Sequence, residues 1–95
     1  MRRQAMSREE AEAIALAGLA TLAQDPNRIA RFFALSGLEP SQIRELATTP
    51  SFQTAVLGHF RGDESLLLVF AANLGIDPAR VADAEALLSG RPRGG

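Results

Sequence analysis

The residues best suited to chemistry lie together between positions 59 and 65. His59, Asp63 and Ser65 are the residue types of a nucleophilic triad, in which a histidine base activates a serine and an acid orients the histidine. Asp63 also stands directly before an apolar run, where a helix N-cap is expected. His59 falls near the end of the preceding helix, where the dipole favours it. We therefore favour folding roles, and a small hydrolase using His59 and Asp63 is the third hypothesis.

Metal and cofactor sites find little support in the same region. His59, Asp63 and Glu64 offer one imidazole and two carboxylates, without the second histidine or the cysteine of typical zinc sites. The chain has no cysteine, and neither glycine-rich phosphate-binding motif occurs in it. We expect no catalytic residue, no metal and no cofactor.

A DNA-binding motif is the second hypothesis. The segment FAANLGIDPARVADA, residues 70–84, has the spacing of a helix-turn-helix, with small, glycine and aliphatic residues at Ala71, Leu74, Gly75, Ile76 and Val81. The helix that would read DNA offers one arginine, Arg80, among the acids Asp77, Asp83 and Glu85. Phosphate groups would be repelled there.

Length and charge limit the function classes. The 95 residues suffice for one domain, and 46 % apolar with 22 % charged residues is typical of globular proteins. Residues 7–89 contain six arginines and eleven acids, so the net charge of this part is about −5. Nucleic acid is therefore not an expected partner.

Local signals predict six helices, at about 8–23, 26–36, 40–47, 50–60, 64–74 and 78–88. Each start has an oxygen-bearing side chain that can cap the first turn, and four starts add a proline. The predicted caps are Ser7, Asp25, Glu39, Thr49, Asp63 and Asp77. Gly37, Gly62, Gly75 and Gly90 are placed to end helices in the left-handed conformation.

These elements predict an all-α fold: a compact orthogonal bundle of five or six short helices around a central apolar helix at about 64–74. This helix is apolar on every side between Leu66 and Ala72, which is typical of an element that others surround. A Leu68→Ala substitution would then cost about 2–5 kcal/mol. The single domain spans 7–89, between a disordered basic tail at 1–6 and a disordered Gly/Arg/Pro tail at 90–95.

Two surfaces are candidates for a protein partner. Arg28 and Arg31 lie one turn apart, and Arg44 and Arg61 could join them in an anion-binding patch. The outer side of the first helix carries Ala13, Leu16 and Ala20, which suit close contact with another helix. The leading hypothesis is an interaction or accessory module without catalysis, with an unknown protein partner or self-association through this helix.

The N-terminus resembles a secretory signal only superficially. Two arginines precede an apolar stretch, but Glu9, Glu10 and Glu12 interrupt the pattern, and the stretch is too short to span a bilayer. We expect a cytoplasmic protein without membrane contact.

The segments GLEPSQIR (37–44) and GDESLLLVFAANLGIDP (62–78), joined by PSFQTAVLGHF, resemble the bacterial family catalogued as domain of unknown function 3572. The resemblance covers about residues 8–89. It implies a small helical protein of no established activity, so it assigns no site residue. Glu39 departs from the aspartate that is frequent before this proline in the family. The related segments GLEPSQI and GIDPARV fit either a duplication or two uses of one helix-corner pattern.

Overall fold

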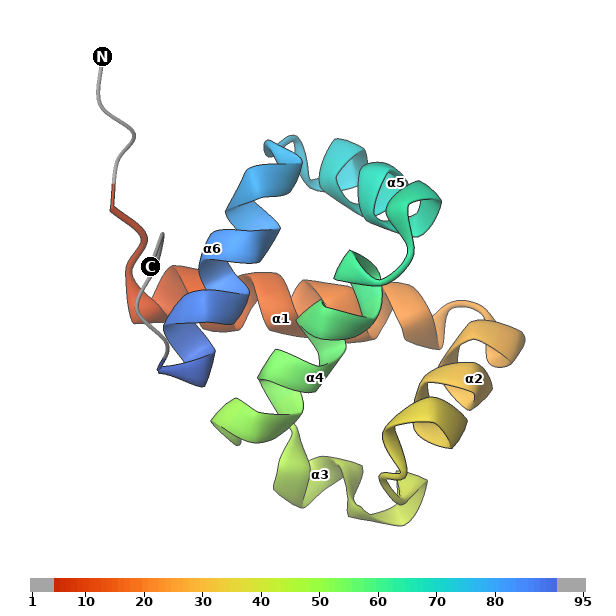
Figure 1. Ribbon diagram of the computed structural model, residues 1–95. Coiled ribbons are helices and arrows are strands. Elements are labelled where there is room, and N and C mark those ends of the chain that lie inside the picture. Colours follow the sequence, from red (N-terminus) through yellow and green to blue (C-terminus); the bar gives the residue numbers. More distant parts are fainter. Residues whose placement is uncertain (1–4, 91–95) are drawn as a thin grey trace.

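The protein folds into six α-helices and one short 3-10 helix in a computed structural model that describes residues 5–90. The elements are α1 (Arg8–Ala23), α2 (Pro26–Ser36), the 3-10 helix η1 (Pro40–Gln42), α3 (Ile43–Leu46), α4 (Pro50–Arg61), α5 (Glu64–Leu74) and α6 (Pro78–Ser89). Figure 1 shows α4 and α6 crossing α1, with α5 at one side and α2 and α3 at the other. The predicted all-α bundle is confirmed, with no strand between residues 5 and 90.

The helix boundaries follow local chemistry. Five N-cap side chains accept hydrogen bonds of 2.8–3.3 Å from first-turn amides: Ser7, Asp25, Thr49, Asp63 and Asp77. Three helices end on glycines with φ between 70° and 76°, at Gly37, Gly75 and Gly90. The same prediction for Gly62 is wrong, because its φ is −82°. There the chain passes through a right-handed turn directly into the Asp63 cap of α5.

The segment predicted as one helix at 40–47 is divided into η1 and the single turn α3. Glu39 stands at the N-cap position, but its side chain makes no capping hydrogen bond, so that predicted role is wrong. Glutamate is not among the residues that cap well, because its longer side chain does not hold the carboxylate beside the first-turn amides. Thr49 ends the segment with extended backbone, as the residue before a proline does.

Asp63 and Glu39 provide a matched test of capping. We expect Asp63→Ala to lower the free energy of unfolding by about 1 kcal/mol, because the amide of Leu66 loses its acceptor. Glu39→Ala should change it by less than about 0.5 kcal/mol, since no capping bond is lost. Urea denaturation followed by circular dichroism measures both. Equal losses in the two variants would contradict this assignment.

The core lies where α1, α4 and α6 meet. Its α4 residues are at most 2 % exposed: Phe52, Val56, Leu57 and Phe60. The facing side chains are Ala11, Ile14, Ala15 and Leu22 of α1, and Val81, Ala84 and Leu88 of α6. Burial of these apolar surfaces is the main driving force for folding. The helix at the centre is therefore α4, packed against both α1 and α6.

The prediction that the helix at 64–74 is central is wrong. In α5, Leu66, Phe70 and Ala71 are buried, but Leu68 is 49 % exposed, Val69 56 % and Leu74 39 %. Apolar residues on every side of a helix do not indicate which side meets the core. Here α5 packs on α4 and α6 through one face and leaves the opposite face open.

The ends of the domain differ slightly from the predicted limits. Met6, which falls in the predicted basic tail, is partly buried against the core. Gly90, the first residue of the predicted C-terminal tail, caps α6. Ala5 is exposed, and residues 1–4 and 91–95 of the two predicted tails lie outside the described residues.

Between residues 5 and 90, no single helix is long and apolar enough to cross a membrane. Helices α5 and α6 meet those length and composition criteria only as a pair, which is bent by 98° at its break.

Candidate functional site

A cavity of about 470 Å³ opens between α2, the end of α4 and the start of α5. It unites two groups of residues that the sequence indicated separately: Arg28 and Arg31 on one side, and His59, Asp63 and Ser65 on the other. Its other lining residues are Leu35, Gly58, Gly62, Glu64 and Leu66.

Two further hollows adjoin this cavity. One, of about 430 Å³, has four lining residues in common with the cavity: Arg28, Asp63, Ser65 and Leu66. Its other lining residues are Thr21, Gln24, Asp25, Val69 and Asn73. Another of about 230 Å³ shares Leu35 and His59 and continues to Phe32, Ser36 and Ala55. Because neighbouring hollows share lining residues, they form one elongated depression, which we call the α2–α5 groove.

His59 is partly buried in this groove against an aromatic side chain. Its ring meets the ring of Phe32 edge-on, with centroids 5.4 Å apart and planes at 83°. Burial lowers the pKa of His59 below the usual 6.5. The carboxylate of Asp63 opposes this shift, whereas the guanidinium groups of Arg31 and Arg28 add to it. The imidazole is therefore mostly neutral at pH 7.

The stability of the protein is expected to fall as the pH decreases below 6.5. The pKa of His59 is lower in the folded chain than in the unfolded one, so the unfolded chain binds the proton first. The stability that comes from a neutral His59 is fully present above pH 6.5. It is lost progressively as the pH falls from 6.5 through the lower pKa of the folded chain. Urea denaturation between about pH 5 and pH 8 measures it. His59→Gln should flatten the profile, and an unchanged profile would contradict the burial of a neutral imidazole.

The three triad residue types share a cavity but are not connected as a triad. The Oδ1 atom of Asp63 accepts a hydrogen bond of 3.2 Å from the backbone N–H of Leu66. Within residues 5–90, no hydrogen bond joins His59 to Asp63 or to Ser65. Asp63 acts here as a helix cap, and nothing in the described contacts activates Ser65.

No three side chains of the types that bind metals gather closely enough to hold an ion, within the part of the chain that the structure describes. His59, Asp63 and Glu64 thus provide no metal centre of that size.

Arg28 and Arg31, which the sequence indicated as a possible anion-binding patch, differ in their ion pairs. Arg28 Nε lies 3.6 Å from Asp25 Oδ2 at the start of the same helix. Arg31 is exposed and makes no ion pair within residues 5–90. The two arginines proposed to join them do not: Arg44 lies outside the groove lining, and Arg61 binds Glu85 of α6. The positive side of the groove thus consists of Arg28 and Arg31.

The outer side of α1 is exposed where the sequence placed a partner surface. Ala13 and Ala20 are exposed, and Leu16 between them is 63 % exposed. The buried residues of this helix lie on the opposite side, toward α4 and α6. These three side chains form an apolar strip along α1.

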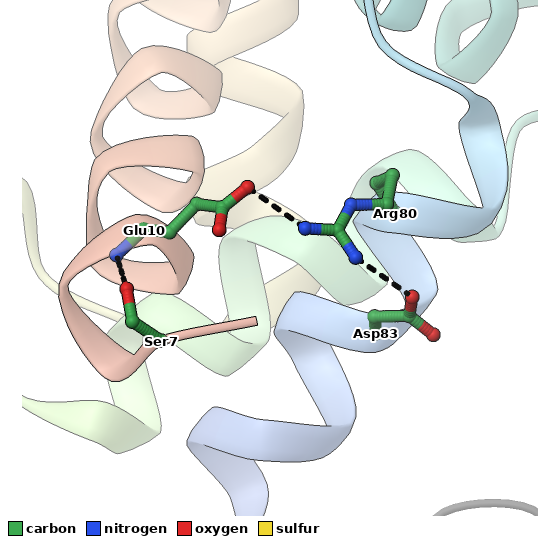
Figure 2. A network of polar contacts seen from close by, with 4 residues as sticks. All are labelled: Ser7, Glu10, Arg80 and Asp83. Atoms are coloured by element: carbon green, nitrogen blue, oxygen red, sulfur yellow. Dashed lines mark hydrogen bonds and ion pairs between the residues drawn. The ribbon is translucent and has the colours of Figure 1, made fainter. Parts of the chain in front are cut away.

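The predicted helix-turn-helix is present as a corner, because α5 and α6 meet at 98°. However, α6 packs between α1 and α4, and only its residues Ala79 and Ser89 are exposed. Figure 2 shows Arg80 between two carboxylates: its Nη2 donates to Glu10 Oε2 at 2.9 Å, and its Nη1 lies 3.7 Å from Asp83 Oδ2. The backbone N–H of Glu10 donates a hydrogen bond to Oγ of Ser7, the N-cap of α1. The arginine of the corner thus ties α6 to α1.

Sequence reasoning missed the apolar part of the groove. Leu35 is 68 % exposed and Val69 is 56 % exposed, and both line it. Each residue belongs to a helix with several apolar side chains, so apolar composition alone does not show that either side chain points away from the core. The hydrophilic residues around them, such as Asn73 and Gln24, are the only local indication of an exposed surface.

Comparison with family models gives one finding that covers nearly the whole chain. Residues 8–91 match the family described as Protein of unknown function (DUF3572). Searches of curated proteins and of solved structures give no match. The match includes every helix from α1 to α6, and it agrees with the resemblance carried by the segments around residues 37–44 and 62–78. The chain belongs to the DUF3572 family of proteins of unknown function.

Proposed function

We propose that this protein is a non-catalytic module that binds another protein. The observation that carries the proposal is the exposure of large apolar side chains on two separate helices: Leu16 of α1, and Leu68 and Val69 of α5, each about half exposed or more. Apolar surface left in water favours association, because a partner that covers it removes it from solvent. A single exposed leucine is ordinary, but neighbouring apolar residues on a helix face suit a partner.

Self-association through α1 is the specific form that we propose for one of these surfaces. Ala13 and Ala20 flank Leu16, so a second helix can approach the backbone of α1 closely while Leu16 fills the space between the two helices. A contact of this kind in a symmetric dimer would place the same strip against its copy.

Light scattering coupled to size exclusion, with the full chain, tests this proposal. We expect the wild type to be larger than a monomer at micromolar concentration and Leu16→Glu to be monomeric, because the charge would be buried at the contact. The variant should keep its thermal stability, since Leu16 is 63 % exposed. Arg8→Glu, on the same helix outside the strip, serves as the control.

A wild-type monomer would remove the self-association. Affinity capture from the native host with the wild type and with Leu16→Glu then tests the wider proposal: a partner retained by the wild type and lost by the variant supports it. If no captured protein depends on Leu16, on α5 or on the groove, the interaction role is wrong.

The two other hypotheses have one favourable observation each. The sharp α5–α6 corner fits a helix-turn-helix, but α6 has little exposed surface to present to a DNA groove, and Arg80 is engaged by Glu10 and Asp83. A mobility shift with genomic DNA at low salt tests this hypothesis. The shared cavity favours a hydrolase, but Asp63 caps α5. If the protein hydrolysed an activated ester and His59→Gln abolished this activity, the hydrolase hypothesis would be supported.

A further inference from the structure

The α2–α5 groove has exposed apolar side chains on both sides of its main cavity. Leu35 lies where this cavity meets the smallest hollow, Val69 lines the hollow on the other side, and each is more than half exposed. Leu66, which is 6 % exposed, lines the middle. Two of the large exposed apolar side chains of this domain therefore border the same depression. A ligand lying along it would cover both.

The α2 side of the groove offers positive charge that the opposite side does not neutralise by contact. Within residues 5–90, no ion pair crosses from Arg28 or Arg31 to Asp63 or Glu64. Asp63 directs Oδ1 to the backbone amide of Leu66, and Asp25 holds only the Nε side of Arg28. Arginine donates up to five hydrogen bonds, so both guanidinium groups retain donors for an added carboxylate.

The acids of the groove limit the kind of anion it can accept. Asp25, Asp63 and Glu64 line it beside the two arginines. A polyphosphate or nucleic-acid backbone would place repeated negative charge against these acids and against a domain of net charge about −5. A single carboxylate between Arg28 and Arg31 avoids most of that repulsion. The elongated shape, with exposed apolar side chains along it, suits a peptide better than a compact ligand.

We propose that the α2–α5 groove binds a peptide segment of a partner protein that contains an acidic residue beside a large apolar one, with the carboxylate against Arg28 and Arg31 and the apolar side chain against Leu35. This proposal rests on the interaction function proposed above and names the chemistry of one partner. The bound segment covers Leu35 and supplies the anion that Arg31 lacks within the described residues. It also places a negative charge near His59, which lines the same cavity.

The test uses the full chain and a library of random seven-residue peptides displayed on phage, followed by calorimetry with the selected peptides. We expect the selected sequences to combine Asp or Glu with Leu, Ile or Phe. Arg31→Gln should weaken their binding about tenfold, through loss of a charge-assisted hydrogen bond. Leu35→Gln should weaken it similarly. Arg44→Gln removes an exposed arginine outside the groove and should change affinity less than about twofold.

A second readout comes from the histidine. The chain contains one histidine, so its ring-proton signals give the pKa of His59 directly by nuclear magnetic resonance. A bound carboxylate should raise this pKa, because it offsets the positive charge of Arg28 and Arg31. A peptide that binds elsewhere would leave the pKa unchanged. Melting curves of the three variants establish that their folds are intact.

Three results would overturn the groove proposal: no enriched peptide, enriched peptides without acidic residues, or affinities that Arg31→Gln leaves unchanged. The last two would leave the general interaction function standing, especially if Leu16→Glu abolished the binding. Failure of selection together with no association that depends on Leu16, α5 or the groove would remove both proposals.

Discussion

Phe60→Ala is expected to destabilise the protein by about 3–5 kcal/mol, the largest loss among the substitutions considered. Phe60 is 0 % exposed and stacks on Phe70, with ring centroids 4.3 Å apart and planes at 23°. Its removal opens a cavity between α4, α1 and α5 that the surrounding helices cannot fill without moving. A domain of this size has about 5–15 kcal/mol of total stability, so the variant should unfold at a much lower temperature.

Leu68→Ala is the control for this experiment. Leu68 is 49 % exposed on the outer face of α5, so its truncation should cost about 1 kcal/mol or less. Circular dichroism is the suitable probe in urea, because the chain has no tryptophan or tyrosine. A cost of several kcal/mol at Leu68, with a small cost at Phe60, would return α5 to the centre of the core and contradict the packing.

The helix boundaries were predictable because their causes are local. Helices start at Pro26 and at Pro50, each directly after a capping residue, Asp25 or Thr49. The cap accepts a first-turn hydrogen bond, and the proline ring fixes φ at a value that suits a helix. Glu39 before Pro40 has the same arrangement with one additional methylene, and it does not cap. An oxygen-bearing side chain before proline is therefore not sufficient for a cap, because the side chain must also be short enough to reach the first-turn amides.

The position of α5 was not predictable from its composition. A fully apolar helix satisfies the sequence criterion for a central element equally well at the edge of a small bundle, if one face remains uncovered. The less apolar α4 became central because Phe52, Val56 and Phe60 recur at helical spacing, so that α1 and α6 can pack on it. Which helices pack together depends on the angles between consecutive helices, and the residue pattern within a single helix does not determine those angles.

The groove was predictable only in parts. The sequence indicates Arg28 and Arg31 as a charged pair one turn apart, and His59 and Asp63 as a cluster at a helix junction. Their union in one cavity depends on α2 lying beside the end of α4, which is a long-range contact. The exposure of Leu35 has the same origin, because α2 meets α4 mainly through Phe32.

Gly18→Val should be the second most damaging substitution, at about 1–3 kcal/mol. A Cβ atom at Gly18 would lie 3.0 Å from Phe60 Cε2 and 3.1 Å from Val56 Cγ1. Both neighbours are almost fully buried, and Phe60 is held against Phe70, so neither can move away easily. Glycine costs about 1 kcal/mol within a helix relative to alanine, and the close approach of α1 to α4 offsets that cost.

Ala20→Val, on the exposed side of α1, is the control because it introduces the same side chain without the contact. Helix propensity alone would favour Gly18→Val and disfavour Ala20→Val, so a larger cost at Gly18 must come from packing. A cost at Gly18 no greater than at Ala20 would contradict the close packing. A double-mutant cycle sharpens the test: Val56→Ala removes the Cγ1 atom that a Gly18→Ala side chain would meet. The two changes together should cost less than the sum of their separate costs, with a favourable coupling of about 0.5 kcal/mol or more in urea denaturation. Additive costs would mean that α1 moves away from α4 as a rigid helix, and the gap would then extend to the contact with Phe60.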